Sequence, residues 1–364
     1  MKVAIQHETL TVDATGHVAG HDAGDTLVRR LLRLFPGAQL VGPRAHHHPD
    51  FDLVPLELID ASDTVLINMD VIDSVAIWRT FRQTTDKPKI MNFVWWDATR
   101  YEDTVEAAEV SLSCALFPTF ANSDRTMRAI ADTVRRWTVK PLAERARIGG
   151  VNLGIQLEHV QPRQETPTPI VLYPAIYVSA RKQPHQFIDV VTKVAKRTPI
   201  TVEARLSEAH LVSEPAMRLS RERWAKVGPL VPSRSDYWKA LARTTAFLAT
   251  ATEESYGLEY VEALVAGAVG IFPDTDWARS ILPPRYPFFF STPAEAEDML
   301  YRAVTDTAAC LKELDACVDG SFVDWLRDHH DDDDFDAAMA EHVTRWFGPV
   351  EVALPEPGGT TQRA

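Results

Sequence analysis

Residues 249–267 read ATATEESYGLEYVEALVAG, a stretch in which a strand ends, a polar loop follows and a helix begins. Glu254 lies in the loop, Gly257 opens the helix, and Glu262 lies one turn further on. The first turn of a helix presents free backbone amides and the positive end of the helix dipole, which together suit a phosphate group. Gly257 lets the backbone approach such a ligand closely, while Glu254 can accept hydrogen bonds from sugar hydroxyls and Glu262 from both hydroxyls of a ribose. The pattern therefore points to a nucleotide sugar; the alternative is a capped surface helix with solvated acidic side chains.

The chain on both sides of this stretch alternates between predicted strands and helices. Apolar residues recur at helical spacing over residues 26–35, where we expect Asp25 to cap the helix and Gly37 to end it. Strands that alternate with helices predict parallel sheets whose two faces are covered by helices. Short apolar runs predict the strands over residues 3–5, 39–41, 64–67, 90–96, 170–173, 200–204, 246–249 and 269–272.

A proline-rich segment divides the chain. Residues 161–169 read QPRQETPTP, with three prolines and no apolar pattern, which is typical of a linker. The predicted fold class is α/β, with two doubly wound Rossmann-like domains that face each other across a cleft. Ligands of such sheets bind at the carboxyl ends of the strands, so we expect the substrates in that cleft. The predicted parts are an N-terminal domain at 1–160, the linker at 161–169, a C-terminal domain at 170–330, a helix at 331–350 that packs back on the N-terminal domain, and a flexible tail at 351–364.

Composition and charge argue against several classes of protein. The 364 residues carry a net charge of −13, which disfavours a protein that coats nucleic acid, although a local basic patch is compatible with it. Three scattered cysteines make neither a disulfide framework nor a zinc cluster, and they fit a reducing, cytoplasmic compartment. No apolar stretch reaches the ~18 residues of a membrane span, and the N-terminus lacks the apolar core of a secretory signal. The histidines at 46–48 and the acidic run at 331–334 are more typical of solvated polar segments than of metal ligands, so we assign no metal.

The segment that begins at Glu254 also resembles a known signature. Its first five residues, ESYGL, followed by Glu262, are similar to the E-x7-E motif of retaining glycosyltransferases with the GT-B fold, above all glycosyltransferase family 4. The family pattern reads roughly E-G-F-G-L-x-x-x-E-A-x-A-x-G, and here Ser255 replaces its first glycine and Tyr256 its phenylalanine. The resemblance covers about residues 1–305, because weaker matches follow in the family's order at residues 121–124 (ANSD), 148–152 (IGGVN), 227–230 (VGPL), Tyr237 and Leu241.

This resemblance implies a role for each residue of the motif. Glu254 is implied to contact the donor sugar, and Glu262 to hold the ribose. Gly257 and Leu258 are implied to offer backbone amides to the diphosphate.

The resemblance also implies cations beside the diphosphate. Lys182 aligns best with the family's phosphate-binding lysine. The family's arginine, about four residues earlier, has no basic counterpart here, so either Arg181 or Arg205 takes its place. Cations at this point fit the chemistry, since the leaving diphosphate gains negative charge in the transition state. The alternative for Arg181 and Lys182 is a solvated pair in a loop.

The first domain departs further from the family. Trp96 occupies the position of a histidine that the family places beside the reacting sugar. With Trp95 it can form a stacking wall for a sugar, or both can belong to the core. Gly24 matches a glycine pair that the family places under the donor phosphate and the acceptor. His7, at the end of the first strand, points by topology to the same cleft or serves a structural role.

The activity that the resemblance implies is transfer of a sugar from a nucleotide diphosphate donor to a hydroxyl acceptor, with retention of configuration and without a metal or other cofactor. The acceptor stays open among glycans, lipids, proteins, metabolites and modified nucleic-acid bases. Two alternatives remain. One is a protein that binds a nucleotide sugar or glycan without transferring it, and the other is a nucleotide-sugar epimerase.

Overall fold

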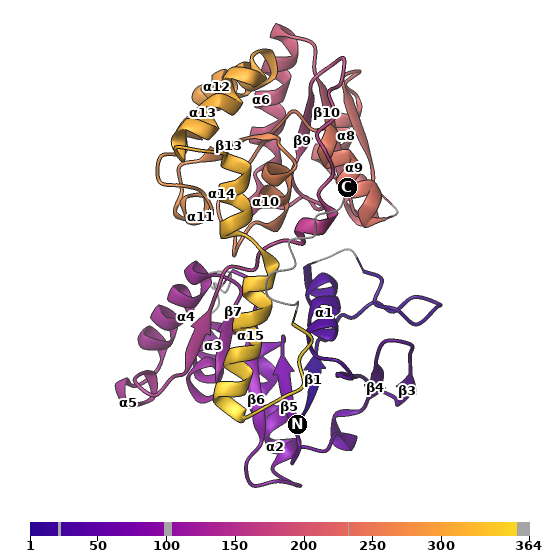
Figure 1. The fold of residues 1–364 in the computed structure, drawn as a ribbon, viewed down its shortest axis with the longest axis vertical. Coiled ribbons are helices and arrows are strands. Elements are labelled where there is room, and N and C mark those ends of the chain that lie inside the picture. Colours follow the sequence, from indigo (N-terminus) through magenta and orange to yellow (C-terminus); the bar gives the residue numbers. More distant parts are fainter. Residues whose placement is uncertain (21–22, 98–103, 232, 355–364) are drawn as a thin grey trace. The chain divides into compact units, whose positions relative to one another are not determined.

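The computed structural model describes residues 1–20, 23–97, 104–231 and 233–354 (Figure 1). The chain divides into two compact units, which are described separately below. Residues 1–152 and 333–364 form the N-terminal unit, and residues 153–332 form the C-terminal unit. The sequence pattern predicts divisions at residues 161–169 and 330. The proline-rich segment itself belongs to the C-terminal unit, where Arg163 donates a hydrogen bond to the carbonyl oxygen of Thr244.

The N-terminal unit is built on a sheet in which eight strands of the described chain pair in the order β3-β4-β2-β1-β5-β6-β7-β8. All neighbouring strands are parallel except β3 and β4. The strand order reverses between β1 and β5. Strands β2 and β4 lie on one side of β1, and the strands from β5 to β8 lie on the other side. The strands are β1 (Lys2–Gln6), β2 (Gln39–Val41), β3 (His46–His47), β4 (Asp52–Val54), β5 (Thr64–Asn68), β6 (Lys89–Val94), β7 (Thr119–Ala121) and β8 (Ile148–Gly150).

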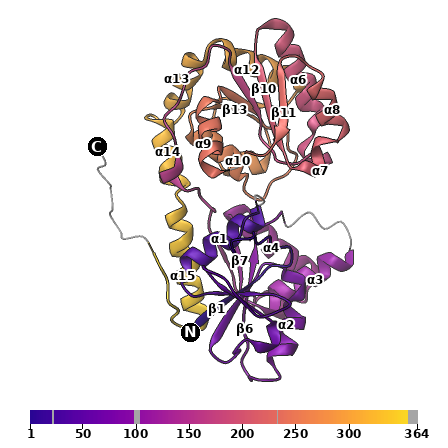
Figure 2. The same ribbon diagram turned by 90° about the vertical axis from the view of Figure 1, so that its right-hand side faces the viewer.

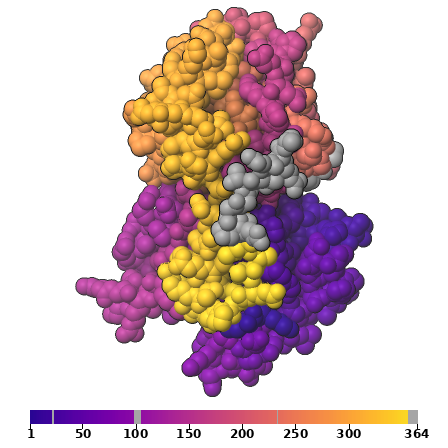
Figure 3. Space-filling model, viewed as in Figure 1, coloured from indigo at the N-terminus to yellow at the C-terminus, as the bar shows by residue number. Residues whose placement is uncertain are grey.

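Helices cover both faces of this sheet, and Figure 2 shows α2, α3 and α4 on one face and α1 and α15 on the other. The last helix packs through Phe335, whose ring lies 5.9 Å from that of Phe93 and 5.6 Å from that of Phe120. Figure 3 shows the yellow end of the chain on the surface of this unit. The helices are α1 (Ala23–Leu34), α2 (Ser74–Phe81), α3 (Thr104–Leu116), α4 (Asp124–Trp137), α5 (Lys140–Ala143) and α15 (Asp332–Phe347).

The C-terminal unit has a wholly parallel sheet, in which six strands of the described chain pair in the order β11-β10-β9-β12-β13-β14. The order reverses between β9 and β12, and the carboxyl ends of the strands at such a reversal are where ligands of open α/β sheets bind. The strands are β9 (Ile170–Tyr173), β10 (Thr201–Leu206), β11 (Ala225–Pro229), β12 (Ala246–Leu248), β13 (Val269–Pro273) and β14 (Phe289–Phe290). The helices are α6 (Pro184–Arg197), α7 (Glu208–Leu211), α8 (Glu214–Ser220), α9 (Arg234–Arg243), α10 (Leu258–Val265), α11 (Asp276–Ser280), α12 (Pro293–Thr305), α13 (Thr307–Cys317) and α14 (Phe322–His329).

The observed elements confirm the α/β fold class with two doubly wound domains and correct two details. The predicted strand at 90–96 ends at Val94, so Trp95 and Trp96 follow β6. Asp25 is not the N-cap of the first helix, because α1 already begins at Ala23. Asp25 instead lies buried in the first turn, where it accepts a hydrogen bond from the backbone N–H of Thr11. Among the described residues, no helix is long and apolar enough to cross a membrane.

Candidate functional site

The site of interest lies at the carboxyl ends of β9 and β12. The chain leaving β9 leads to Lys182, and the chain leaving β12 leads to Glu254 and then to α10. Gly257, the N-cap of α10, has a φ of +85°, and a Cβ there would lie 2.7 Å from Cδ2 of Tyr260. Glycine is required here because other residues rarely adopt this φ and because their Cβ would collide with the ring of Tyr260. The sharp turn at Gly257 lets α10 begin directly beside the loop that carries Glu254.

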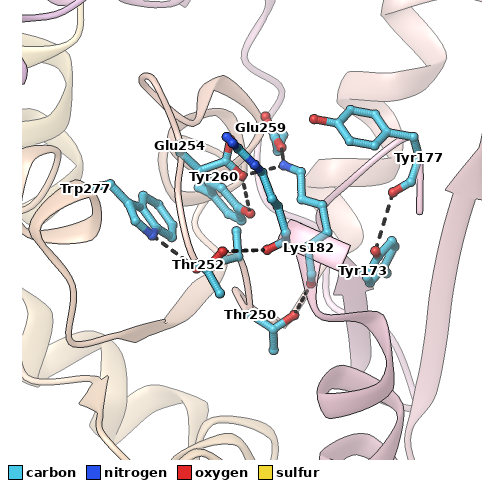
Figure 4. A network of polar contacts seen from close by, with 11 residues as sticks. Tyr173, Tyr177, Lys182, Thr250, Thr252, Glu254, Glu259, Tyr260 and Trp277 are labelled. Carbon is cyan, nitrogen blue, oxygen red and sulfur yellow. Dashed lines mark hydrogen bonds and ion pairs between the residues drawn. The ribbon is translucent and has the colours of Figure 1, made fainter. Parts of the chain in front are cut away.

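Lys182 lies at the centre of this site between two carboxylates (Figure 4). Its Nζ is 2.5 Å from Oε1 of Glu254 and 2.6 Å from Oε1 of Glu259. Only 5% of the Lys182 side chain is exposed, compared with 13% for Glu254 and 30% for Glu259. The rings of Tyr177 and Tyr260 flank the ammonium group, each with its centroid 5.4 Å away. A buried ammonium is retained here because carboxylates and aromatic faces replace its hydration.

Hydrogen bonds to backbone carbonyl oxygens hold the two loops that carry these side chains. The Thr250 hydroxyl donates to the carbonyl oxygen of Lys182 at 2.7 Å. The N–H of Thr252 donates to the carbonyl oxygen of Arg181 at 2.8 Å, and Trp277 Nε1 donates to that of Ala251 at 3.1 Å. Figure 4 shows these bonds beside the Lys182 cluster. The position of Lys182 opposite Glu254 is therefore set by the backbone as well as by charge.

The electrostatics of the cluster favour a charged lysine. Burial by itself disfavours the ammonium, but Glu259, Tyr260 and Glu254 outweigh it, so the pKa of Lys182 is raised well above its ordinary value. Burial raises the pKa of Glu254 in spite of the nearby Lys182. Burial likewise raises the pKa of Tyr260, whose hydroxyl donates to Oε1 of Glu254 at 3.0 Å. The cluster thus offers a permanent cation and two acidic side chains to a ligand.

Glu262 forms a second polar group one turn further along α10. It is 3% exposed, and its two carboxylate oxygens accept from different residues. Arg234 Nη2 lies 2.5 Å from Oε1, and the hydroxyl of Tyr237 donates to Oε2 at 2.7 Å. Burial disfavours the charge on Arg234, but Glu262 outweighs burial and raises the pKa of the guanidinium. Glu262 is therefore held in one orientation, and each oxygen keeps a lone pair for a further donor.

Tyr256, the residue before Gly257, has a defined role in the structure. The hydroxyl of Tyr256 accepts from the N–H of Gly154 at 3.2 Å and lies 2.7 Å from Nδ1 of His330. Nε2 of His330 lies 3.0 Å from the carbonyl oxygen of Ile281, so it carries the proton and Nδ1 accepts from Tyr256. Burial lowers the pKa of His330 to about 4, so the imidazole is neutral near pH 7. Each polar atom of this buried relay thus has a partner.

The two basic residues considered beside Lys182 lie at different places. Arg181 is half-buried and immediately precedes Lys182, and its carbonyl oxygen takes part in the loop hydrogen bonds. Arg205 lies in β10, where a Cβ on Gly228 would approach its Nη1 to 3.0 Å. Arg181 is therefore the direct sequence neighbour of Lys182, whereas Arg205 lies on β10, two strands away from β12 in the sheet.

The candidates of the N-terminal unit lie at the carboxyl edge of its own sheet. Trp96 is 9% exposed and packs in an apolar cluster with Val94, Val110 and Cys114, as the core-packing alternative describes. Gly24 lies against His7, since a Cβ on Gly24 would approach Nε2 of His7 to 2.4 Å.

Three residues of the site were missed by sequence reasoning. These are Glu259, Arg234 and Tyr237. An acidic residue in the first turn of a helix is common because it complements the helix dipole, so Glu259 carried no distinctive signal. Tyr237 belongs to a weak sequence match, but its bond to Glu262 depends on the packing of α9 against α10.

Comparisons with known proteins give relatives in structure only. No protein-family model matches the sequence, and no curated protein matches it closely enough to count as a relative. Anabaena Alr3699/HepE, solved in complex with UDP and glucose, is similar over 94% of this chain and 99% of its own, with a TM-score of 0.70 and 14% identity. Sucrose-phosphate synthase from Thermosynechococcus elongatus is similar over 95% of this chain and 99% of its own, with a TM-score of 0.69 and 10% identity.

A third structure, that of TarM, is similar over 78% of this chain with a TM-score of 0.58 and 12% identity, and the chain spans 55% of the length of TarM. At these identities the likeness concerns the fold. Together with the two doubly wound units, it shows that this chain has the GT-B fold of these glycosyltransferases.

Proposed function

We propose that this protein is a retaining glycosyltransferase that moves a sugar from a nucleotide diphosphate donor to a hydroxyl acceptor. The observation that carries the proposal is the position of Lys182. It is a buried, permanently charged lysine at the carboxyl edge of β9, directly beside the N-terminus of α10. A buried cation next to free backbone amides is suited to a diphosphate.

The donor is held in three places along this edge. Lys182 and the backbone amides of Gly257 and Leu258 bind the diphosphate, Glu254 accepts from hydroxyls of the donor sugar, and Glu262 accepts from the ribose. Glu262 is pre-organised for this task because Arg234 and Tyr237 fix its carboxylate. The HepE structure was solved with UDP and glucose, which supports a UDP-sugar as the first donor to test.

In the reaction, the bond between the anomeric carbon and the diphosphate oxygen breaks while the acceptor oxygen bonds to the same face of that carbon. The proton of the acceptor hydroxyl passes to the departing phosphate. Negative charge grows on the diphosphate as it leaves, and Lys182 and the amides of α10 stabilise it without rearrangement. The residues of this chain then supply position and charge, and no step requires a metal.

The first experiment is a thermal-shift panel with UDP, GDP, ADP, TDP and CDP. A ligand at about 100 times its Kd adds about 2.7 kcal/mol to the stability of the native state, which is readily detected. We expect one of the five nucleotides to raise the melting temperature of the wild type. The same nucleotide should leave the melting temperature of Glu262→Ala unchanged. If none of them shifts the wild type, the proposed donor site is wrong.

A second candidate function is binding of a nucleotide sugar without transfer. It is favoured by Trp96, which packs in the core at the position where the family carries a histidine beside the reacting sugar. The two functions separate in one assay. A donor that binds but yields no free nucleoside diphosphate with any acceptor indicates the binding function.

A further inference from the structure

Glu259 places a second carboxylate on the lysine that the proposed function assigns to the diphosphate. Its Oε1 is 2.6 Å from Lys182 Nζ, and Oε1 of Glu254 is 2.5 Å from the same nitrogen. The cluster of two carboxylates and one ammonium therefore carries a net negative charge when both carboxylates are ionised. A diphosphate that approached Lys182 in this arrangement would meet two like charges within ion-pair distance, which is strongly unfavourable in a partly buried site.

Of the two carboxylates, that of Glu259 is better placed to move away from Lys182. Glu254 also accepts a hydrogen bond from Tyr260, and 13% of its side chain is exposed. Glu259 is 30% exposed, and within the described part of the chain Lys182 is its one hydrogen-bonding or ion-pairing partner. Glu259 also lies in the first turn of α10, the turn whose amides the proposed function gives to the diphosphate. A rotation of its side chain toward solvent would uncover Lys182 beside this turn.

We propose that Glu259 is a built-in counterion that occupies Lys182 in the ligand-free protein and yields it to the diphosphate of the donor. This inference rests on the proposed function, because it names the group that competes with the donor for its phosphate-binding lysine. Glu259 satisfies the buried cation when the site is empty, and its removal from Lys182 is part of the cost of binding the donor. It thereby lowers the affinity for the nucleoside diphosphate product as well, which favours product release.

The test is Glu259→Gln, which keeps the shape of the side chain and removes its charge. The Kd of the wild type and of the variant is measured by titration calorimetry for UDP, GDP, ADP, TDP, CDP and inorganic pyrophosphate. For the best of the five nucleotides, the matching nucleoside without phosphates is titrated as well. Glu297→Gln serves as the matched control, because Glu297 also pairs with two cations, Arg197 at 2.9 Å and Lys193 at 3.7 Å, but lies on α12.

We expect Glu259→Gln to bind the diphosphate and pyrophosphate about tenfold more tightly than the wild type, a change of about 1.4 kcal/mol. We expect the affinity for the nucleoside to stay within about twofold and Glu297→Gln to behave as the wild type.

Three results contradict the inference, and they are distinguishable. If the wild type binds a diphosphate and Glu259→Gln binds it equally or more weakly, Glu259 is not a competitor and the proposed function stands. If neither protein binds any of the five nucleotides or pyrophosphate, the proposed function fails and this inference fails with it. An equal gain in Glu297→Gln attributes the effect to overall charge and also overturns the role of Glu259.

Discussion

The hydroxyl of Tyr256 lies 2.7 Å from Nδ1 of His330 in the interior of the C-terminal unit. The two residues are distant in sequence. One adjoins the N-terminus of α10, and the other adjoins a boundary between the two units. Tyr256 precedes Gly257, the N-cap of α10, and His330 precedes the segment in which the chain passes from one unit to the other. Gly154, the third member of the relay, follows the other such passage. The loop of the candidate site is thus bonded to both connecting segments of its own unit.

Tyr256→Phe tests this relay. Removal of the hydroxyl leaves the N–H of Gly154 and Nδ1 of His330 buried without their present partner, which costs about 1–3 kcal/mol of unfolding free energy. Urea unfolding at pH 7 measures the difference. The matched control is Tyr301→Phe, since the Tyr301 ring packs on Arg197 at the surface; we expect a change within about 0.5 kcal/mol. Equal stability of Tyr256→Phe and the wild type would refute the relay.

His330 should make the stability of the protein depend on pH. Its pKa in the folded protein is lowered to about 4 by burial, below the ordinary value of 6.5, so the unfolded chain binds the proton more readily. The stabilisation is fully present above pH 6.5 and is lost as the pH falls toward 4, by roughly 3 kcal/mol in all. We expect His330→Asn to be less stable than the wild type at pH 7 and to lack this part of the acid slope. An acid slope unchanged in His330→Asn, with exposed His185→Asn as the control, would contradict the assignment.

Lys182→Met should weaken diphosphate binding and reduce turnover. The loss of one group that stabilises developing charge lowers kcat by about 10²–10³-fold. Circular dichroism and thermal unfolding of the variant establish that it is folded. Lys193→Met, an exposed lysine on α6, is the control and should keep wild-type rates. Comparable rates in Lys182→Met and Lys193→Met would remove Lys182 from the site.

Glu262→Ala and Lys182→Met should differ in which part of the nucleotide they no longer bind. Glu262 is assigned to the ribose and Lys182 to the diphosphate, so Glu262→Ala should weaken the nucleoside and the nucleoside diphosphate alike. Lys182→Met should weaken only the diphosphate. Calorimetric titration of both ligands into both variants measures this pattern. The reverse pattern, or the same loss in both variants, would show that the two roles are assigned wrongly.

The fold was predictable from the sequence because it depends on local patterns. Apolar runs and helical spacing repeat along the chain, and the structure confirms a strand or helix at nearly every predicted range. The family resemblance implies one site for Lys182 and Glu254, which are 72 residues apart, and the parallel sheet brings the carboxyl ends of their strands to one edge. Their roles remain predictions.

The remaining features depend on packing that local patterns do not encode. Arg234 pairs with Glu262 across 28 residues, and an arginine at the start of a helix has no feature that reveals such a partner. Glu259 reads as an ordinary acidic residue at a helix N-terminus until its distance to Lys182 is known. Asp25 looks like a helix cap in sequence, but α1 begins two residues before it, so Asp25 lies in the first turn of the helix.

The measurement that tests the central claim most directly is the release of nucleoside diphosphate from UDP-glucose, and from the corresponding sugar donors of the other four bases, with a panel of hydroxyl acceptors. We predict that the wild type releases the diphosphate from one donor, that the transferred sugar keeps its anomeric configuration, and that Lys182→Met releases it at least about 10²-fold more slowly. Donor binding without release by the wild type, with every acceptor, would contradict the claim that this protein transfers sugars.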